Sequence, residues 1–206
     1  HNGPLGIELI QPVDGPSGYR AMLDSVGEGM YGVAASVCEP GQFETLQADL
    51  AAQGIGIRQS GTFFDAVDVY QLDTRDALSN VIVEVHCPRR ADWQSRIHPH
   101  EVLQMDLNRL GPQFLPTQKM LHIGVVCKDR DRTKANLQKL FGMQRWIEFK
   151  IETGVSMEDT TYYGQPCYHA YDNHVGRLGE LCFELITPRS DKCVYDEFLK
   201  ARGEGM

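Results

Sequence analysis

The chain lacks the short motifs that mark several large classes of protein. It has no CxxC pair, so neither a zinc finger nor a thioredoxin-like redox site is indicated. It has no Gly-rich phosphate loop and no GxSxG sequence, which argues against the common nucleotide-binding loops and the serine hydrolase elbow. No apolar run approaches the roughly 20 residues that a helix needs to span a bilayer.

Basic residues are also fewer than acidic ones. The formal net charge is -8 at pH 7, and so acidic a surface repels phosphate backbones and anionic lipid headgroups. We therefore expect neither nucleic acid nor a membrane as a partner. Hydrophobic residues make up 42% of the chain, enough to bury a core and form a globular protein.

The six cysteines stand alone, and four of them lie in apolar or strand-like runs where a reduced thiol behaves as a small hydrophobe. This usage is typical of free cysteines in a reducing compartment, and we expect a cytoplasmic protein.

The chain repeats itself. Residues 8–30 and 184–206 match without a gap, and their identical pairs include Glu8 with Glu184, Tyr19 with Tyr195 and the closing GEGM sequence. Two explanations stay open. The chain is a fragment of a longer tandem protein, which we favour, or its elements are permuted, with strands exchanged between subunits.

Two segments read as strand, helix and three strands. The expected strands are 31–37, 55–60, 66–72 and 81–86 in the first segment, and 121–127, 145–151, 161–171 and 181–186 in the second. We divide the chain into the last strand (6–11) and helix of a preceding module (1–30), a βαβββ module (31–90), a linker (91–119) and a βαβββ module with a closing helix (120–206).

Three titratable residues interrupt apolar strands. Glu84, Glu184 and His122 each share a strand face with apolar neighbours, because side chains alternate along a strand. A buried unpaired charge is costly, so each needs a partner or a metal. Their similar placement in successive modules favours a functional role over three separate core residues.

The sequence resembles the vicinal oxygen chelate superfamily, which includes glyoxalases and methylmalonyl-CoA epimerases. The run from Leu121 to Asp129 looks like the first strand of such a module, and the strings ELIQP, EVHCP and ELITP look like its last strand. The GEGM sequence resembles the junction between paired modules in the epimerases. The resemblance implies an α+β fold, in which tandem βαβββ modules form cup-shaped mixed sheets.

The resemblance also implies a metal site. Each module would give a histidine from its first strand and a carboxylate or amide from its last, and the bound cation would stabilise an enolate while a base moves a proton. His122 matches the first-strand histidine, and Glu8, Glu84 and Glu184 match the last-strand position. The cation would be Mn, Co, Ni, Zn or Fe, and Glu84 and Glu184 are the candidate catalytic residues.

The first module departs from this pattern, because Gly32 falls on the histidine position and cannot bind a metal through a side chain. If residues 31–88 pair with 121–188, the cup holds His122, Glu184 and Glu84 with one corner open. If they pair with a preceding module, the cup of Glu8 and Glu84 has lost a histidine.

Other residues are weaker candidates. His86 follows Glu84 by two positions and could substitute as a ligand, although a structural role is favoured. The run from His98 to Glu101 contains a proline and reads as a solvated turn. The cluster Tyr162, Tyr163, Tyr168 and His169 is typical of sheet packing, and one of its members is a candidate for substrate contact.

Three functions follow. The first is a metal-dependent isomerase or epimerase acting on an acyl-CoA or a 2-oxo substrate. The second is a glyoxalase-type lyase using the same enolate chemistry. The third is a binding protein without catalysis, which Gly32 favours. We expect a small-molecule substrate and a homodimer, because an incomplete module leaves sheet edges uncovered.

Overall fold

Two four-stranded mixed sheets form the protein in a computed structural model that describes residues 6–36, 39, 41–98 and 121–206. The fold class is α+β, as the sequence predicts. Most of the expected linker, residues 99–119, lies outside the described residues, as does Cys38.

The first sheet has the strand order β1-β4-β3-β2. Its elements and flanking helices are α1 (Gly18–Val26), β1 (Gly32–Ser36), α2 (Phe43–Ala52), β2 (Ile57–Phe63), β3 (Val67–Leu72), β4 (Ile82–Pro88) and α3 (Trp93–Arg96).

The second sheet has the equivalent order β5-β10-β9-β6. Its elements are β5 (Ile123–Val126), α4 (Arg130–Phe141), β6 (Trp146–Glu152), β9 (Ala170–Leu178), β10 (Leu181–Pro188) and α5 (Val194–Arg202), with a small hairpin of β7 (Thr161–Tyr162) and β8 (Gln165–Pro166).

The two sheets share one topology. In each, the first strand pairs parallel to the last, and the remaining neighbours are antiparallel. The register sets Ala34 opposite Glu84 in the first sheet and Gly124 opposite Glu184 in the second. By this register His122, two residues before Gly124, takes the place that Gly32 has in the first sheet.

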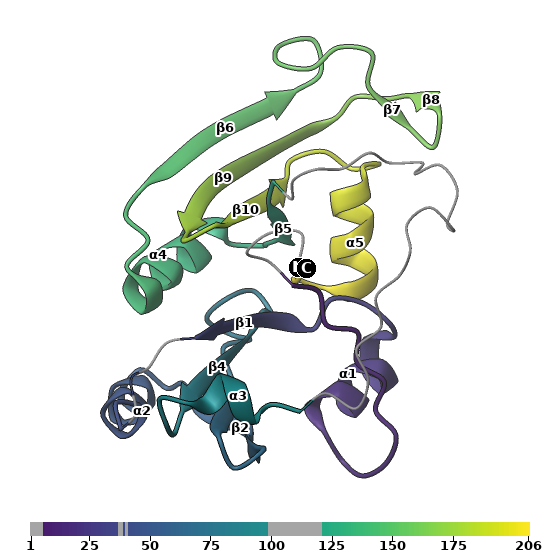
Figure 1. Ribbon diagram of the computed structural model, residues 1–206. Helices are drawn as coiled ribbons and strands as arrows, with labels where there is room; N and C mark the ends of the chain where they lie inside the picture. The colour runs from purple at the N-terminus through teal and green to yellow at the C-terminus, as the bar shows by residue number, and fades with distance from the viewer. Residues whose placement is uncertain (1–5, 37–38, 40, 99–120) are drawn as a thin grey trace, which may run out of the picture.

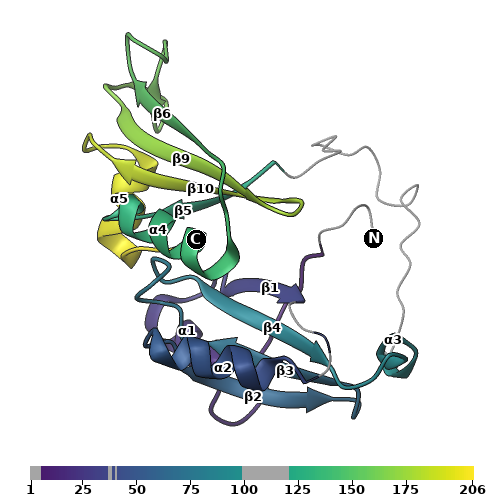
Figure 2. The same cartoon turned by 90° about the vertical axis from the view of Figure 1, so that its left-hand side faces the viewer.

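Helices cover opposite faces of the sheets. Figure 1 shows α2 and α4 on one side of the molecule and α1 and α5 on the other, and Figure 2 confirms this from the side. The repeat explains the likeness of α1 and α5. Side chains at Ser17 and Cys193 cap their N-termini, and Gly27 and Gly203 with positive φ end them.

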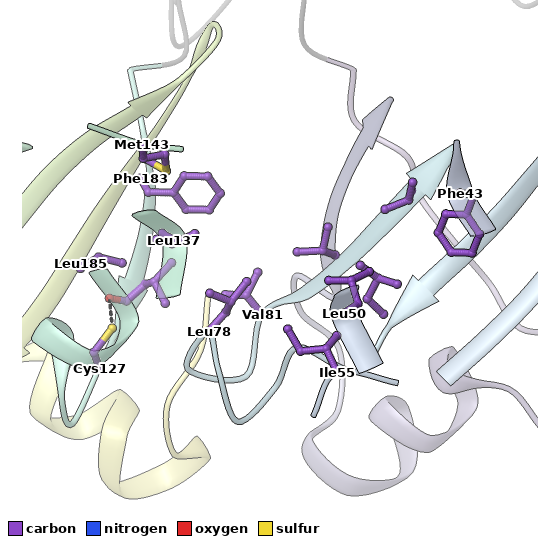
Figure 3. Close-up of a cluster of buried hydrophobic side chains, with 14 of the residues drawn as sticks. Phe43, Leu50, Ile55, Leu78, Val81, Cys127, Leu137, Met143, Phe183 and Leu185 are labelled. Atoms are coloured by element: carbon purple, nitrogen blue, oxygen red, sulfur yellow. Dashed lines mark hydrogen bonds between the residues drawn. The ribbon is translucent and has the colours of Figure 1, made fainter. Parts of the chain in front are cut away.

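A single apolar core joins the two sheets. Strand alternation sends Val83 and Val85 of β4 and Phe183 and Leu185 of β10 into this core, each at most 3% exposed. Figure 3 shows Leu78 and Val81 between the side chains of the two sheets. The alternate residues, Glu84 and Glu184, therefore face the opposite, concave side, where α1 and α5 lie.

The structure differs from the sequence-based expectations at two strands. Residues 6–11 form no strand, and their apolar side chains are exposed, because no neighbouring strands flank them in the structure. The strand expected at 161–171 is instead a short hairpin, and the long strand β9 begins only at Ala170. In the described part of the chain, every helix is too short or too polar to cross a bilayer.

Candidate functional site

A carboxylate, a carboxamide and an imidazole meet on the concave face of the second sheet. Glu184 of β10 lies beside His122, with 3.0 Å between His122 Nε2 and Glu184 Oε2. Asn173 of β9 donates a hydrogen bond from Nδ2 to Glu184 Oε1. The Glu184 side chain is 12% exposed and His122 is 43% exposed, so the carboxylate is held inside and the imidazole opens toward solvent.

Asn173 keeps one unused acceptor at this centre. Its Oδ1 atom is buried and has no hydrogen-bond partner within the described residues. An amide oxygen, a carboxylate and an imidazole nitrogen are ligand types that suit divalent transition metals. By the chemistry of their donor atoms, His122 and Glu184 are the residues that would hold a cation, with Asn173 Oδ1 as a further donor beside Glu184.

Aromatic rings form a wall beside this centre. The ring centroids of Tyr171 on β9 and Tyr195 on α5 are 4.9 Å apart, and His169 lies 5.2 Å from Tyr171. Burial, followed by the nearby Tyr171 and Glu184, raises the pKa of Tyr195 to about 12. Burial also lowers the pKa of His169, so its imidazole is neutral at pH 7.

The first sheet carries a comparable cluster around Glu84. His86 Nε2 lies 2.8 Å from Glu84 Oε1, and Gln71 Nε2 donates to Glu84 Oε2 at 3.0 Å. Tyr19 of α1 also donates to Glu84 Oε2, at 3.4 Å, and Tyr31 donates to Gln71 Oε1 at 2.7 Å. The carboxylate of this cluster is therefore saturated by the chain's own donors.

These hydrogen bonds set the charge state of the first cluster. The His86 hydrogen bond is the main cause that lowers the pKa of Glu84, with help from Gln71 and Tyr19 and against the cost of burial. Burial and the Glu84 charge raise the pKa of Tyr19 far above its usual range. At pH 7, Glu84 is an anion and Tyr19 a neutral donor.

Gly32 is required by the close approach of β1 to β4. A Cβ atom at this position would lie 2.5 Å from the carbonyl oxygen of Ile82, well inside contact distance. The matching residue of the second sheet is His122, which precedes β5 and is half open to solvent. A histidine in β1 therefore has no room, and the imidazole of the first cluster comes from His86 instead.

The candidate residues fall into two separate pairs. The structure places His122 with Glu184 and His86 with Glu84, and no three of the His, Cys, Asp or Glu side chains in the described ranges could hold one metal ion together. Glu8 lies in the exposed segment before α1, and its charge adds to the raised pKa of Tyr19. A cup that combines Glu84 with His122 and Glu184 is not what the structure shows.

Of the tyrosine cluster noted in the sequence, three members lie away from the centre. Tyr162 and Tyr163 donate to Glu197, and Tyr168 donates to Glu152. His169 belongs to the aromatic wall. His98 lies edge-on to Phe64, with ring centroids 6.5 Å apart, whereas residues 99–101 fall outside the described part.

Sequence reasoning did not identify several residues of the two clusters. Gln71 and Asn173 orient the two glutamates, and Tyr19, Tyr171 and Tyr195 line the concave faces. The repeat pointed to two of these residues, since Tyr19 and Tyr195 form an identical pair in the matching segments.

Comparison with solved structures identifies the fold. A mutant of 4-hydroxymandelate synthase from Streptomyces coelicolor, a protein of the vicinal oxygen chelate type, matches 94% of this chain with a TM-score of 0.52 and 16% sequence identity. The chain has the vicinal oxygen chelate fold. It spans about half the length of that enzyme, covering 51% of its chain.

Other comparisons add less to this assignment. Methylmalonyl-CoA epimerase from Mycobacterium tuberculosis is 12% identical, covers 77% of this chain over 85% of its own, and has a TM-score of 0.23, which is too low to support an argument. No protein-family model and no curated protein matches the sequence. The vicinal oxygen chelate resemblance seen in the sequence is thus confirmed at the level of the fold.

Proposed function

We propose that the chain is a metal-dependent isomerase or epimerase whose reacting centre is the His122–Glu184 pair on the second sheet. The observation that carries the proposal is the 3.0 Å separation of His122 Nε2 and Glu184 Oε2 on the concave face. Two ligand atoms that each lie about 2.1 Å from one cation, at a right angle, are about 3.0 Å apart. Coordination of a cation by both atoms would replace the contact between them with little change in their separation.

The neighbouring residues would prepare this pair for binding. Asn173 holds one oxygen of Glu184, which leaves the other free to face His122. The partly exposed imidazole of His122 gives access from solvent, while Tyr171 and Tyr195 shield the inner side from water. When bound, a divalent cation would stabilise negative charge that develops on a substrate oxygen as a proton leaves the adjacent carbon.

Proton transfer in such a centre needs a group that is unprotonated at pH 7. His169 of the aromatic wall is our candidate, since burial lowers the pKa of its imidazole. Its Nε2 atom is buried without a hydrogen-bond partner in the described part of the chain, so the substrate would have to reach it inside the wall. We propose an acyl-CoA or 2-oxo compound as substrate, from the likeness of the GEGM junction to that of the epimerases. Cys127, Cys167, Cys182 and Cys193 form no disulfide within the described residues, which accords with the reducing, cytoplasmic location that we propose.

A second candidate, binding of a small molecule without catalysis, is favoured by the first sheet. There, Gly32 stands where the resemblance implies a histidine ligand, and Glu84 is in contact with His86, Gln71 and Tyr19. If the second sheet holds no cation either, the aromatic wall would bind a small molecule without catalysing a reaction.

Metal content tests the proposal directly. The purified protein would be analysed for transition metals and then titrated with Co²⁺, whose visible spectrum reports nitrogen and oxygen ligation. We expect one site per chain, lost in His122→Ala and retained in His98→Ala, which removes a histidine far from the centre. Exchange of the α-proton of methylmalonyl-CoA with solvent deuterium, followed by NMR, would then test the chemistry.

The outcomes separate the two candidates. Co²⁺ binding that depends on His122, together with proton exchange, supports the isomerase. A protein that binds no cation, or that binds one equally well without His122, rules out the proposed centre and leaves binding as the function to pursue.

A further inference from the structure

A pocket of about 110 Å³ lies where α1 and α5 meet, apart from the His122–Glu184 centre. Figure 1 shows the two helices on the same side of the molecule, one beside each sheet. Met22 of α1 and Phe198 of α5 form apolar parts of the lining. Three arginines complete it, namely Arg58 of β2, Arg75 after β3, and Arg202 at the end of α5.

The charge of this pocket is opposite to that of the chain. Arg75 is paired with Asp73 through two hydrogen bonds of 2.6 and 2.7 Å. Within the described residues, no carboxylate lies within ion-pair distance of Arg58 or Arg202. Asp73 lies near enough to Arg58 for the arginine charge to lower its pKa. The three arginines of the lining still outnumber the acidic side chains around them, which is a local excess of positive charge in a chain with a net charge of -8.

The one acidic residue in the lining is already engaged. Glu204 accepts hydrogen bonds from Ser79 at 3.1 Å and from the backbone N–H of Lys128 at 2.7 Å, and it pairs with Arg132 at 3.2 Å. Its charge is therefore offset by neighbours outside the pocket. The amide of Asn80 adds a neutral donor to the lining, whereas the Ser25 hydroxyl already donates to the backbone of α1.

The chain positions Arg58 closely. A Cβ atom at residue 18 would lie 2.2 Å from the Tyr31 hydroxyl and 3.1 Å from Arg58 Nε. Because Gly18 has no side chain, the Tyr31 hydroxyl and the Arg58 guanidinium can both pack against it. Arg202 is fixed at the other end, since Arg202 Nη1 donates to the carbonyl oxygen of Glu28 at 2.9 Å. Both guanidinium groups thus have a contact that orients them and keep further donors free.

We propose that this pocket binds a phosphate group. Guanidinium groups match phosphate geometry with paired N–H donors, and several arginines from different elements suit a dianion with several oxygens better than a single carboxylate. The phosphate could be inorganic phosphate or the phosphate of a larger metabolite. The site does not depend on the metal centre proposed above.

Isothermal titration calorimetry at low ionic strength tests this site with inorganic phosphate, adenosine 3′,5′-bisphosphate and acetate. We expect saturable binding of a phosphate ligand and weaker binding of acetate. Arg58→Gln and Arg202→Gln should each weaken phosphate binding about ten-fold, the value of one charged hydrogen bond. Arg145→Gln, which removes an exposed arginine elsewhere, should leave it unchanged.

The ligands distinguish free phosphate from a phosphorylated metabolite, and the variants distinguish loss of binding from loss of folding. Equal affinity for both phosphate ligands indicates free phosphate, and tighter binding of the bisphosphate indicates a metabolite. Thermal unfolding would verify that each variant folds, and the exposed Arg202 is the safer change if Arg58→Gln does not. Absence of saturable phosphate binding, or an equal loss in Arg145→Gln, would overturn the proposal.

Discussion

Glu84 and His86 lie two residues apart on β4 and are joined by a hydrogen bond of 2.8 Å. On the second sheet, the same pairing of carboxylate and imidazole joins Glu184 to His122, which comes from the start of a different strand. Each concave face thus has a glutamate in contact with a histidine, but the histidine comes from the same strand in the first sheet and from a different one in the second. The difference arises at Gly32, where the spacing of β1 and β4 leaves no space for a side chain.

The His86–Glu84 hydrogen bond should make stability depend on pH. Because the folded protein lowers the pKa of Glu84 below its ordinary value of 4.5, the ionised carboxylate stabilises the fold above about pH 4.5. This contribution is lost as the pH falls through the lower, folded pKa. His86→Ala should therefore reduce the free energy of unfolding by about 1 kcal/mol at pH 7, since the imidazole is partly exposed, and by less at pH 3.

Urea unfolding of wild type and His86→Ala between pH 3 and pH 7 measures this difference. His98→Ala, which removes a histidine near the surface, should follow the wild-type curve at every pH. A His86→Ala penalty that stays constant over the whole range would show that the hydrogen bond does not control the ionisation of Glu84.

Gly32→Ala should destabilise the protein more than the same change in the other module. The new Cβ would lie 2.5 Å from backbone oxygen, and relief requires β1 to move away from β4, at about 1–3 kcal/mol. Gly124→Ala is the matched control, since its Cβ would meet only a methyl group of Ile186 at 3.5 Å. Thermal unfolding of both variants tests this, and equal melting temperatures would contradict it.

The order of elements and the orientation of the central glutamates were predictable from the sequence. Alternation along β4 and β10 places Glu84 and Glu184 opposite the buried Val83, Val85, Phe183 and Leu185, and the structure agrees. The repeat and the module order likewise predicted the fold, because both depend on local patterns.

Partners contributed by distant strands and helices were not predictable. Gln71 and Asn173 are ordinary polar residues in the sequence, and only the pairing of β3 with β4 and of β9 with β10 brings them to the glutamates. The sequence-based prediction placed β9 too early in the chain for a related reason. It contains Asp172, which pairs with Arg130 of α4 at 3.3 Å, and His174, whose Nε2 accepts a hydrogen bond from Arg130 Nε at 3.3 Å. These polar residues conceal a partly buried strand in the sequence.

The shared core predicts that the two sheets unfold together. Leu78 is 1% exposed and lies between the sheets, as Figure 3 shows. Leu78→Ala should cost about 2–5 kcal/mol and shift a single transition, as monitored by tryptophan fluorescence and circular dichroism. Leu121→Ala, at a leucine that is 68% exposed, should change stability little. Two separate transitions in Leu78→Ala would contradict a common core.

The repeated segments differ sharply in burial. Ile7 and Leu9 are 77% and 93% exposed, whereas the matching Phe183 and Leu185 are 3% and 0% exposed. The same pattern of side chains forms a central strand in one copy and no strand in the other, because only β10 has strands on both sides. Sequence alone could not show this, since a strand needs neighbours that lie elsewhere in the chain.

This exposed segment should promote self-association. Apolar side chains in an unpaired stretch with strand propensity tend to add to another sheet or to pack against another chain. We expect analytical ultracentrifugation to show a concentration-dependent dimer that the double change Ile7→Lys and Leu9→Lys weakens at least about ten-fold, because lysines disfavour edge pairing. Val155→Lys introduces charge at another residue, 80% exposed, and should leave the dimer intact. A dimer that persists in the double variant, or a wild type that stays monomeric at high concentration, would show that this segment does not mediate association.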